Sequence, residues 1–209
     1  LEAMAGTLAN IATFYTGVGQ PEKNVPLQER SLKIRTALYG QDPEGIAPPD
    51  AKALGLGYLN YAAALYEANR FGDAAEYVDP AIKGLIRGGM TDTTLFVALS
   101  TGANIYIDAG RQIDALRLAR QGIAMANELL PEEHPFHGFA QGTLAKVLLQ
   151  AGRYEEAEQP ARTALDIMTE RLGPTHRNTL VALHNLGVVQ MRLGQYDEGI
   201  ALMLARHER

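Results

Sequence analysis

No cysteine and no tryptophan occur among the 209 residues of the chain. Without cysteine, the chain cannot form a disulfide scaffold, a thiolate zinc site or a cysteine nucleophile. Aromatic residues make up only 7% of the sequence, so we expect no aromatic platform for stacking bases. Lysine and arginine number 19 against 24 aspartates and glutamates, a net charge of −5 with no basic block. We therefore expect no nucleic-acid partner.

Long apolar runs are also missing. No stretch approaches the roughly 18–20 residues that a membrane-spanning helix needs, so we expect no membrane partner. The composition is that of a globular protein, 46% apolar and 21% charged, with ample material for a packed core. The chain starts at Leu1 without a secretion signal and ends without stop signals. We interpret it as a fragment of a longer protein and expect a cytoplasmic location.

Five turn-forming residues divide the chain at nearly regular intervals of 50, 41, 42 and 42 residues: Gly19, Asn69, Gly110, Gly152 and Gly194. Each ends a segment with helical periodicity. Each segment also has a small residue at the equivalent place: Ala12, Ala62, Ala103, Ala145 and Gly187. A small side chain there lets a second helix approach closely, while neighbouring aliphatic residues fill the core.

A second helical segment follows each turn, as in the openings at residues 153–156 and 195–198. Gly40 and Gly173 end this segment in two of the repeats. The unit is therefore a helix, a tight turn, a second helix and a connector, repeated five times, which predicts ten helices and no strands. We expect a single domain over residues 1–209, with repeats at roughly 1–40, 51–88, 92–130, 134–173 and 176–209.

Three stretches in the last repeats are the most characteristic: Leu172-Gly173-Pro174-Thr175-His176, Leu183-His184-Asn185-Leu186-Gly187 and Gly152-Arg153-Tyr154-Glu155-Glu156. They resemble tetratricopeptide repeats, and in particular the longer repeats of kinesin light chains and many bacterial multidomain proteins. The resemblance covers nearly the whole chain. It implies an all-α, right-handed superhelical solenoid of about five antiparallel helix pairs, with the first helix of each pair on the concave side. The first repeat departs from the pattern at Pro21, where an aromatic residue is usual, and at Asn24, where a small one is.

The connector from Gly40 to Asp50 is longer than its counterparts and rich in turn-forming residues. Lengthening a surface loop costs little free energy, so a tolerated insertion is the simpler interpretation. A loop that contacts a partner is the alternative.

The helical period selects which side chains of the first helices face the concave side. Among them are amides and hydroxyls, which can bond both the N–H and the C=O groups of an extended peptide. Acidic members stand in the N-terminal half and basic members in the C-terminal half, so we predict a groove whose charge polarity orients its ligand. The predicted peptide-binding residues are Asn10, Asn60, Tyr66, Glu67, Thr101, Asn104, Asp108, Thr143, Lys146, His184, Asn185 and Arg192.

No pattern in the sequence indicates an enzyme. His134, His137 and His176 recur at connectors, which we attribute to the repeat and not to a metal site. Neighbouring glutamates at residues 155 and 156 suit the start of a helix, where negative charge stabilises the helix dipole. The glycines at residues 84–89 lack the Lys-Ser/Thr of a phosphate-binding loop. We expect no catalytic residue, no metal and no cofactor.

The leading hypothesis is a scaffold that holds a peptide or protein segment in its concave groove. One alternative is a regulatory or ligand-sensing arm of a larger signalling protein, such as a kinase or a transcription regulator. Another is self-association through exposed terminal repeats. We do not expect binding of a chaperone's C-terminal tail, because the positions of the basic clamp found in some family members hold residues such as Ala9, Thr13 and Asn60. These side chains cannot compensate the charge of a buried carboxylate.

Overall fold

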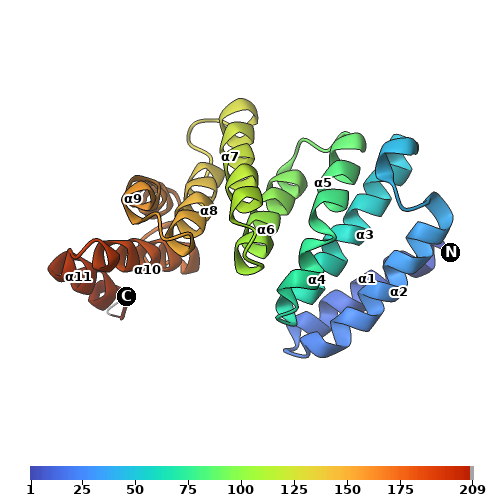
Figure 1. Ribbon diagram of the computed structural model, residues 1–209, viewed down its shortest axis with the longest axis horizontal. Coiled ribbons are helices and arrows are strands. Elements are labelled where there is room, and N and C mark those ends of the chain that lie inside the picture. Colours follow the sequence, from blue (N-terminus) through green and yellow to red (C-terminus); the bar gives the residue numbers. More distant parts are fainter. Residues whose placement is uncertain (208–209) are drawn as a thin grey trace. The chain divides into compact units, whose positions relative to one another are not determined.

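The structure is a computed structural model that describes residues 1–207. These residues form α-helices and one 3-10 turn, with no β-strand among them, which confirms the all-α prediction. Successive helices pack as pairs, for example α1 with α2 and α8 with α9 (Figure 1). The elements are α1 (Glu2–Gly17), α2 (Pro21–Tyr39), η1 (Pro43–Gly45), α3 (Pro48–Glu67), α4 (Phe71–Ala75), α5 (Val78–Arg87), α6 (Thr93–Asp108), α7 (Gln112–Leu129), α8 (Phe136–Gln150), α9 (Tyr154–Leu172), α10 (Arg177–Arg192) and α11 (Tyr196–His207).

The turn inside each helix pair contains a residue in the left-handed region. Asn69 has φ 59°, and the glycines at the equivalent positions 19, 110, 152 and 194 have φ between 74° and 80°. Glycine adopts this conformation without strain, and asparagine is one of the few other residues that tolerates it. The regular spacing in the sequence therefore marks the turns at which each first helix ends.

The second helix of the second repeat is divided into two segments, a break that the repeat pattern does not predict. Helix α4 ends at Ala75 and α5 begins at Val78. Pro80 has no N–H to donate to the carbonyl of Glu76, and its ring crowds that carbonyl. The break leaves Tyr77 between two helical segments.

The chain forms two compact units, Leu1–Ala109 and Gly110–Arg209, called unit 1 and unit 2 below. In unit 1, α3 packs against both α2 and α5. The crossing of α3 and α5 depends on two glycines: a Cβ atom added at Gly84 would lie 2.7 Å from the carbonyl oxygen of Ala51 and from the Cα atom of Gly55. The two backbones are therefore in direct contact.

A buried polar stripe joins α2 to α1 in unit 1. Its members recur at helical spacing: Asn24, Gln28, Ser31 and Arg35. The Ser31 hydroxyl donates to the carbonyl of Ala5 at 2.8 Å, and the Gln28 amide donates to the carbonyl of Ala9 at 3.4 Å. Asn24 donates to the hydroxyl of Thr16 in α1 at 2.6 Å, so the departure from the repeat pattern at this residue belongs to the same contact between α1 and α2.

The long connector is bound to the helices around it. Pro43 is buried, and the Tyr58 hydroxyl donates to the carbonyl of Gln41 at 2.7 Å. Lys83 of α5 pairs with Glu44 at 3.2 Å. The insertion is thus an ordered part of unit 1.

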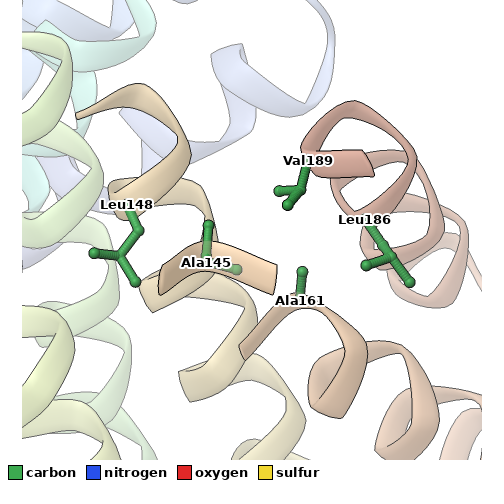
Figure 2. Close-up of a cluster of buried hydrophobic side chains, with 6 residues drawn as sticks. Ala145, Leu148, Ala161, Leu186 and Val189 are labelled. Carbon is green, nitrogen blue, oxygen red and sulfur yellow. The ribbon is translucent and has the colours of Figure 1, made fainter. Parts of the chain in front are cut away.

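In unit 2, small and aliphatic side chains of α8, α9 and α10 form one buried cluster (Figure 2). Ala145 of α8 and Ala161 of α9 are both buried, and they lie beside Leu186 and Val189 of α10. The small side chains let the three helices come together, as the sequence pattern predicts. Across the part of the chain that is described, no helix combines the length and apolarity needed to cross a membrane.

Candidate functional site

The twelve predicted peptide-binding residues all lie on the first helices of the pairs, α1, α3, α6, α8 and α10. We call this set the first-helix face. None of its members is fully buried, and Asn10, Glu67 and Arg192 are exposed. Seven members belong to unit 1 and five to unit 2. Whether they contact a peptide remains a prediction.

Two predicted residues of unit 1 are brought together across neighbouring repeats. The Tyr66 hydroxyl of α3 donates a hydrogen bond to Asp108 Oδ2 of α6 at 2.7 Å. Burial of the phenol, followed by this hydrogen bond and the charge of Asp108, raises the pKa of Tyr66 far above its usual range. The Tyr66 side chain is therefore neutral and hydrogen-bonded to Asp108, and this hydrogen bond joins α3 to α6.

A second polar group links three helices of unit 1. The hydroxyl of Thr16 in α1 donates to Glu67 Oε2 at 2.9 Å, and Asn24 Nδ2 of α2 donates to the Thr16 hydroxyl at 2.6 Å. Asn24 also reaches Glu67 Oε2 at 3.4 Å. Glu67 is thus held by the first repeat, a contact that sequence reasoning missed because Thr16 and Asn24 lie far from it along the chain.

The amides and hydroxyls of the first-helix face fall into two groups. Asn104 donates to the carbonyl of Ser100 at 3.0 Å, and Thr143 donates to the carbonyl of Phe139 at 3.0 Å, each within its own helix. The half-buried amides of Asn60 and Asn185 form no hydrogen bond within the described part of the chain. These two amides, together with the exposed amide of Asn10, are therefore free to bond a peptide backbone.

A cavity of about 410 Å³ lies beside Asp108 in unit 1. The turn between α3 and α4 forms most of it, and the ring of Phe71 there lies 5.4 Å from that of Tyr66. Sequence reasoning missed this hollow, although the left-handed Asn69 marks the turn. Its lining residues are Asn69, Arg70, Phe71, Gly72, Asp73, Asp108 and Ala109.

In unit 2, a buried amide joins α10 to the preceding repeat. Gln190 is fully buried and donates to Glu158 Oε1 of α9 at 3.3 Å. Arg162 of α9 pairs with the same carboxylate and with Glu198 of α11, both at 3.2 Å. This network was not predicted, and it ties α9 to both helices of the following repeat.

Two connector histidines have a structural role. Nδ1 of His134 accepts a hydrogen bond from the backbone N–H of Phe136, and Nδ1 of His176 accepts one from Asn178, each at 3.2 Å. Both thus cap the start of a first helix, which explains their recurrence. Among the described residues, no group of three or more potential metal ligands occurs.

Comparison with known proteins identifies the repeat. The tetratricopeptide-repeat family matches residues 94–170 and 136–204, and a second description of this repeat matches residues 4–44. No curated protein matches the sequence.

Several solved structures share the fold of this chain, and each match covers most of this chain and most of the solved one. A kinesin light chain of Podosopora anserina with nearly identical TPR-like repeats is 20% identical over 100% of this chain and 95% of its own, with a TM-score of 0.76. BtubC (BKLC) from P. vanneervenii is 20% identical over 89% of this chain and 72% of its own, with a TM-score of 0.68.

YrrB, a TPR protein with an unusual peptide-binding site, is 15% identical over 96% of this chain and 84% of its own, with a TM-score of 0.54. Over more than half of its length, then, the chain matches the family, and its helix pairs have the fold of kinesin-light-chain-like repeats. The chain belongs to the tetratricopeptide-repeat family.

Proposed function

We propose that the chain is a scaffold that binds a segment of another protein along its first-helix face. The observation that carries this proposal is the free pair of half-buried amides, Asn60 and Asn185, at equivalent places in two repeats. An asparagine amide offers both a donor and an acceptor, the two groups that an extended backbone needs. YrrB, a TPR protein with an unusual peptide-binding site, shares the fold, so binding of a peptide is compatible with this fold.

Charge on the face supports selectivity for oriented ligands. Its acidic members, Glu67 and Asp108, belong to unit 1, and its basic members, Lys146 and Arg192, belong to unit 2. We propose that the part of the face in unit 1 favours basic residues of a bound segment and that the part in unit 2 favours acidic residues, because opposite charges attract and like charges repel. We propose no catalytic role for the face.

A pull-down from lysate of the source cell tests the proposal. The wild-type chain is compared with the triple variant Asn60→Ala, Asn104→Ala, Asn185→Ala, and bound proteins are identified by mass spectrometry. We expect proteins that the wild type retains and the folded variant loses. Identical sets of bound proteins would show that partners use another surface.

A second candidate function, end-to-end association of copies, is favoured by exposed apolar side chains on the terminal helices. Phe14 of α1 is 64% exposed, whereas Val189, at the equivalent place in α10, is 0% exposed. Val189 packs on alanines of α9, the second helix of the preceding repeat. Helix α1 therefore presents the face that a second helix covers elsewhere in the chain. Met4, Ile11 and Val18 extend this exposed face.

Helix α11 carries a complementary surface. Ile200 and Leu204 are exposed, and they stand where α9 has Glu158 and Arg162. In α9 those two positions contact the following repeat. We propose that α11 of one copy packs on α1 of the next in the way that α9 packs on α10. In such a head-to-tail contact each copy keeps one end for a further copy, so the mass would grow with concentration, into open chains or rings.

Light scattering across a concentration series tests this second function. The proposal predicts a mass that rises with concentration and a return to the monomer mass in Phe14→Lys. The control Ile113→Lys, at an exposed apolar residue of α7, is expected to behave as the wild type. A wild-type mass that stays monomeric at every concentration would refute the proposal, and would leave α1 as a surface for a different occupant.

A further inference from the structure

A second cavity, of about 280 Å³, lies in unit 1 away from the first-helix face. Helices α2 and α5 both pack on α3, and the cavity lies where α2, α3 and the break between α4 and α5 meet. It is slightly smaller than the range typical of whole small-molecule ligands, and so suits a single side chain. Its lining residues are Glu29, Leu32, Lys33, Thr36, Gln41, Tyr58, Tyr61 and Tyr77.

Three tyrosine rings form a fixed aromatic wall. The rings of Tyr61 and Tyr77 meet edge to face, with centroids 4.8 Å apart and an angle of 67° between their planes. The ring of Tyr58 stacks at 6.1 Å from that of Tyr77, and its hydroxyl is anchored on the carbonyl of Gln41. The helix break at Pro80 and the long connector thus both contribute to this wall.

The Tyr61 hydroxyl is one of the polar groups in the cavity that lack a protein partner. Tyr61 is only 7% exposed, and its hydroxyl forms no hydrogen bond within the described part of the chain. The hydroxyl oxygen itself is open to the cavity and is not a buried atom, so a group bound in the cavity can take the place of water as its partner. Glu29 lines the same cavity as Tyr61. Burial, and after it the charge of Glu29, raises the pKa of Tyr61.

One carboxylate, Glu29, and one ammonium group, Lys33, line the cavity. Lys33 pairs with Glu29 at 2.5 Å from a side chain that is 73% exposed, so the ammonium group reaches the carboxylate from the solvent side. Nearby, Arg70 is held by Asp73 at 2.7 Å. When Lys33 swings away, Glu29 loses its ion-pair partner, and its carboxylate can pair with a bound cation.

We propose that this cavity binds the arginine side chain of a partner peptide. A guanidinium group is planar, so it stacks on a tyrosine ring, and its forked N–H groups bond a carboxylate such as Glu29. A remaining N–H reaches the Tyr61 hydroxyl oxygen, which then has its partner. An ammonium group lacks both the plane and the fork, which favours arginine over lysine. This site is independent of the first-helix face and gives unit 1 a second anchor for a bound protein.

Titration with N-acetyl-argininamide, followed by NMR of isotope-labelled tyrosine rings, tests the proposal. The uncharged analogues N-acetyl-citrullinamide and N-acetyl-leucinamide are titrated in parallel. We expect saturable shifts of the Tyr61 and Tyr77 rings with the arginine compound alone. Equal shifts with the citrulline compound, or none with arginine, would overturn the proposal.

Two variants are expected to change the affinity for the arginine compound in opposite directions. Glu29→Gln is expected to weaken binding roughly tenfold, the loss of one charge-assisted hydrogen bond. Lys33→Gln is expected to strengthen binding by about two- to fivefold, because it removes an exposed competitor for the carboxylate. The control Glu155→Gln, at an exposed carboxylate of α9, is expected to leave binding unchanged. Weaker binding in Lys33→Gln would show that Lys33 does not compete with the guanidinium group for Glu29 and would refute the proposal. The triple asparagine variant retains this site, so failure here is distinguishable from failure at the first-helix face.

Discussion

At the scale of single residues, the contact between Gly84 and Gly55 fixes how closely α3 and α5 approach. We predict that Gly84→Ala destabilises the protein by about 1–3 kcal/mol, because the added methyl group meets backbone atoms that cannot move aside. Urea unfolding measures the change. Gly72→Ala is the matched control: nothing lies within 4 Å of the added methyl group, so we expect no loss of stability and a gain of up to about 1 kcal/mol. Equal stability of the two variants would contradict the close crossing.

Tyr66 gives a prediction about alkaline pH. Its pKa is raised in the folded protein by burial and by Asp108, so the folded state holds the phenol proton more tightly than the unfolded state does. The resulting stability is fully present below the unfolded pKa of about 10 and is lost as pH rises above it. Tyr66→Phe is therefore expected to lose less stability than the wild type between about pH 9 and pH 11. Urea unfolding at several pH values measures this, and parallel losses in the two proteins would show that Tyr66 does not carry the effect.

Predictions for single residues succeed where local backbone geometry alone explains why a residue occurs at its position. The turn residues Asn69 and Gly152 are examples, since a left-handed residue is a local requirement. The role of Asn24 was not predictable, because its partners Thr16 and Glu67 come from two other helices. Tyr61 and Glu29 lie in different repeats, and their meeting depends on packing that no local pattern encodes.

At the scale of helices, the small residue at the equivalent place of each first helix sets the distance to its partner. We predict that Ala145→Leu costs about 1–3 kcal/mol, because the buried cluster of α8, α9 and α10 has no room for the larger side chain (Figure 2). Thermal or urea unfolding measures it. Ala124→Leu, at an exposed position of α7, is the control and is expected to change little. A harmless Ala145→Leu would mean that the helix register derived from the repeat is wrong.

The helix break at Pro80 and the long connector show which structural features the sequence predicts and which it does not. The repeat predicts one helix after Asn69, but the structure has two, α4 and α5, because Pro80 interrupts the helix. The sequence does indicate this break, since proline has no N–H for a helical hydrogen bond. The length of the connector from Gly40 to Asp50 is equally visible. Its attachment through Tyr58 and Lys83 is not, because these bonds join segments that only the folded chain brings together.

At the scale of the whole molecule, the helical-repeat fold was predictable because each repeat contacts mainly its neighbours. A recurring local pattern then suffices to predict the order and pairing of helices, and the family match agrees with it. The first-helix face is a weaker prediction. Helical period selects its residues, but it does not reveal that Asn104 and Thr143 bond their own helices while Asn60 and Asn185 do not.

The central claim is that amides of the first-helix face bind a peptide backbone. The most direct test is calorimetric titration of a segment from a captured partner against three folded proteins. These are the wild type, the triple variant Asn60→Ala, Asn104→Ala, Asn185→Ala, and a control triple variant at exposed amides of second helices, Gln121→Ala, Asn127→Ala, Gln159→Ala.

Since Asn60 and Asn185 are the free amides among the three, and each hydrogen bond contributes about 0.5–1.5 kcal/mol, the first triple variant is predicted to lose about 1–3 kcal/mol of binding free energy, at least about a fivefold weaker affinity. The control is predicted to bind as the wild type does. Equal affinity of all three proteins would contradict the account and would place the partner on a different surface.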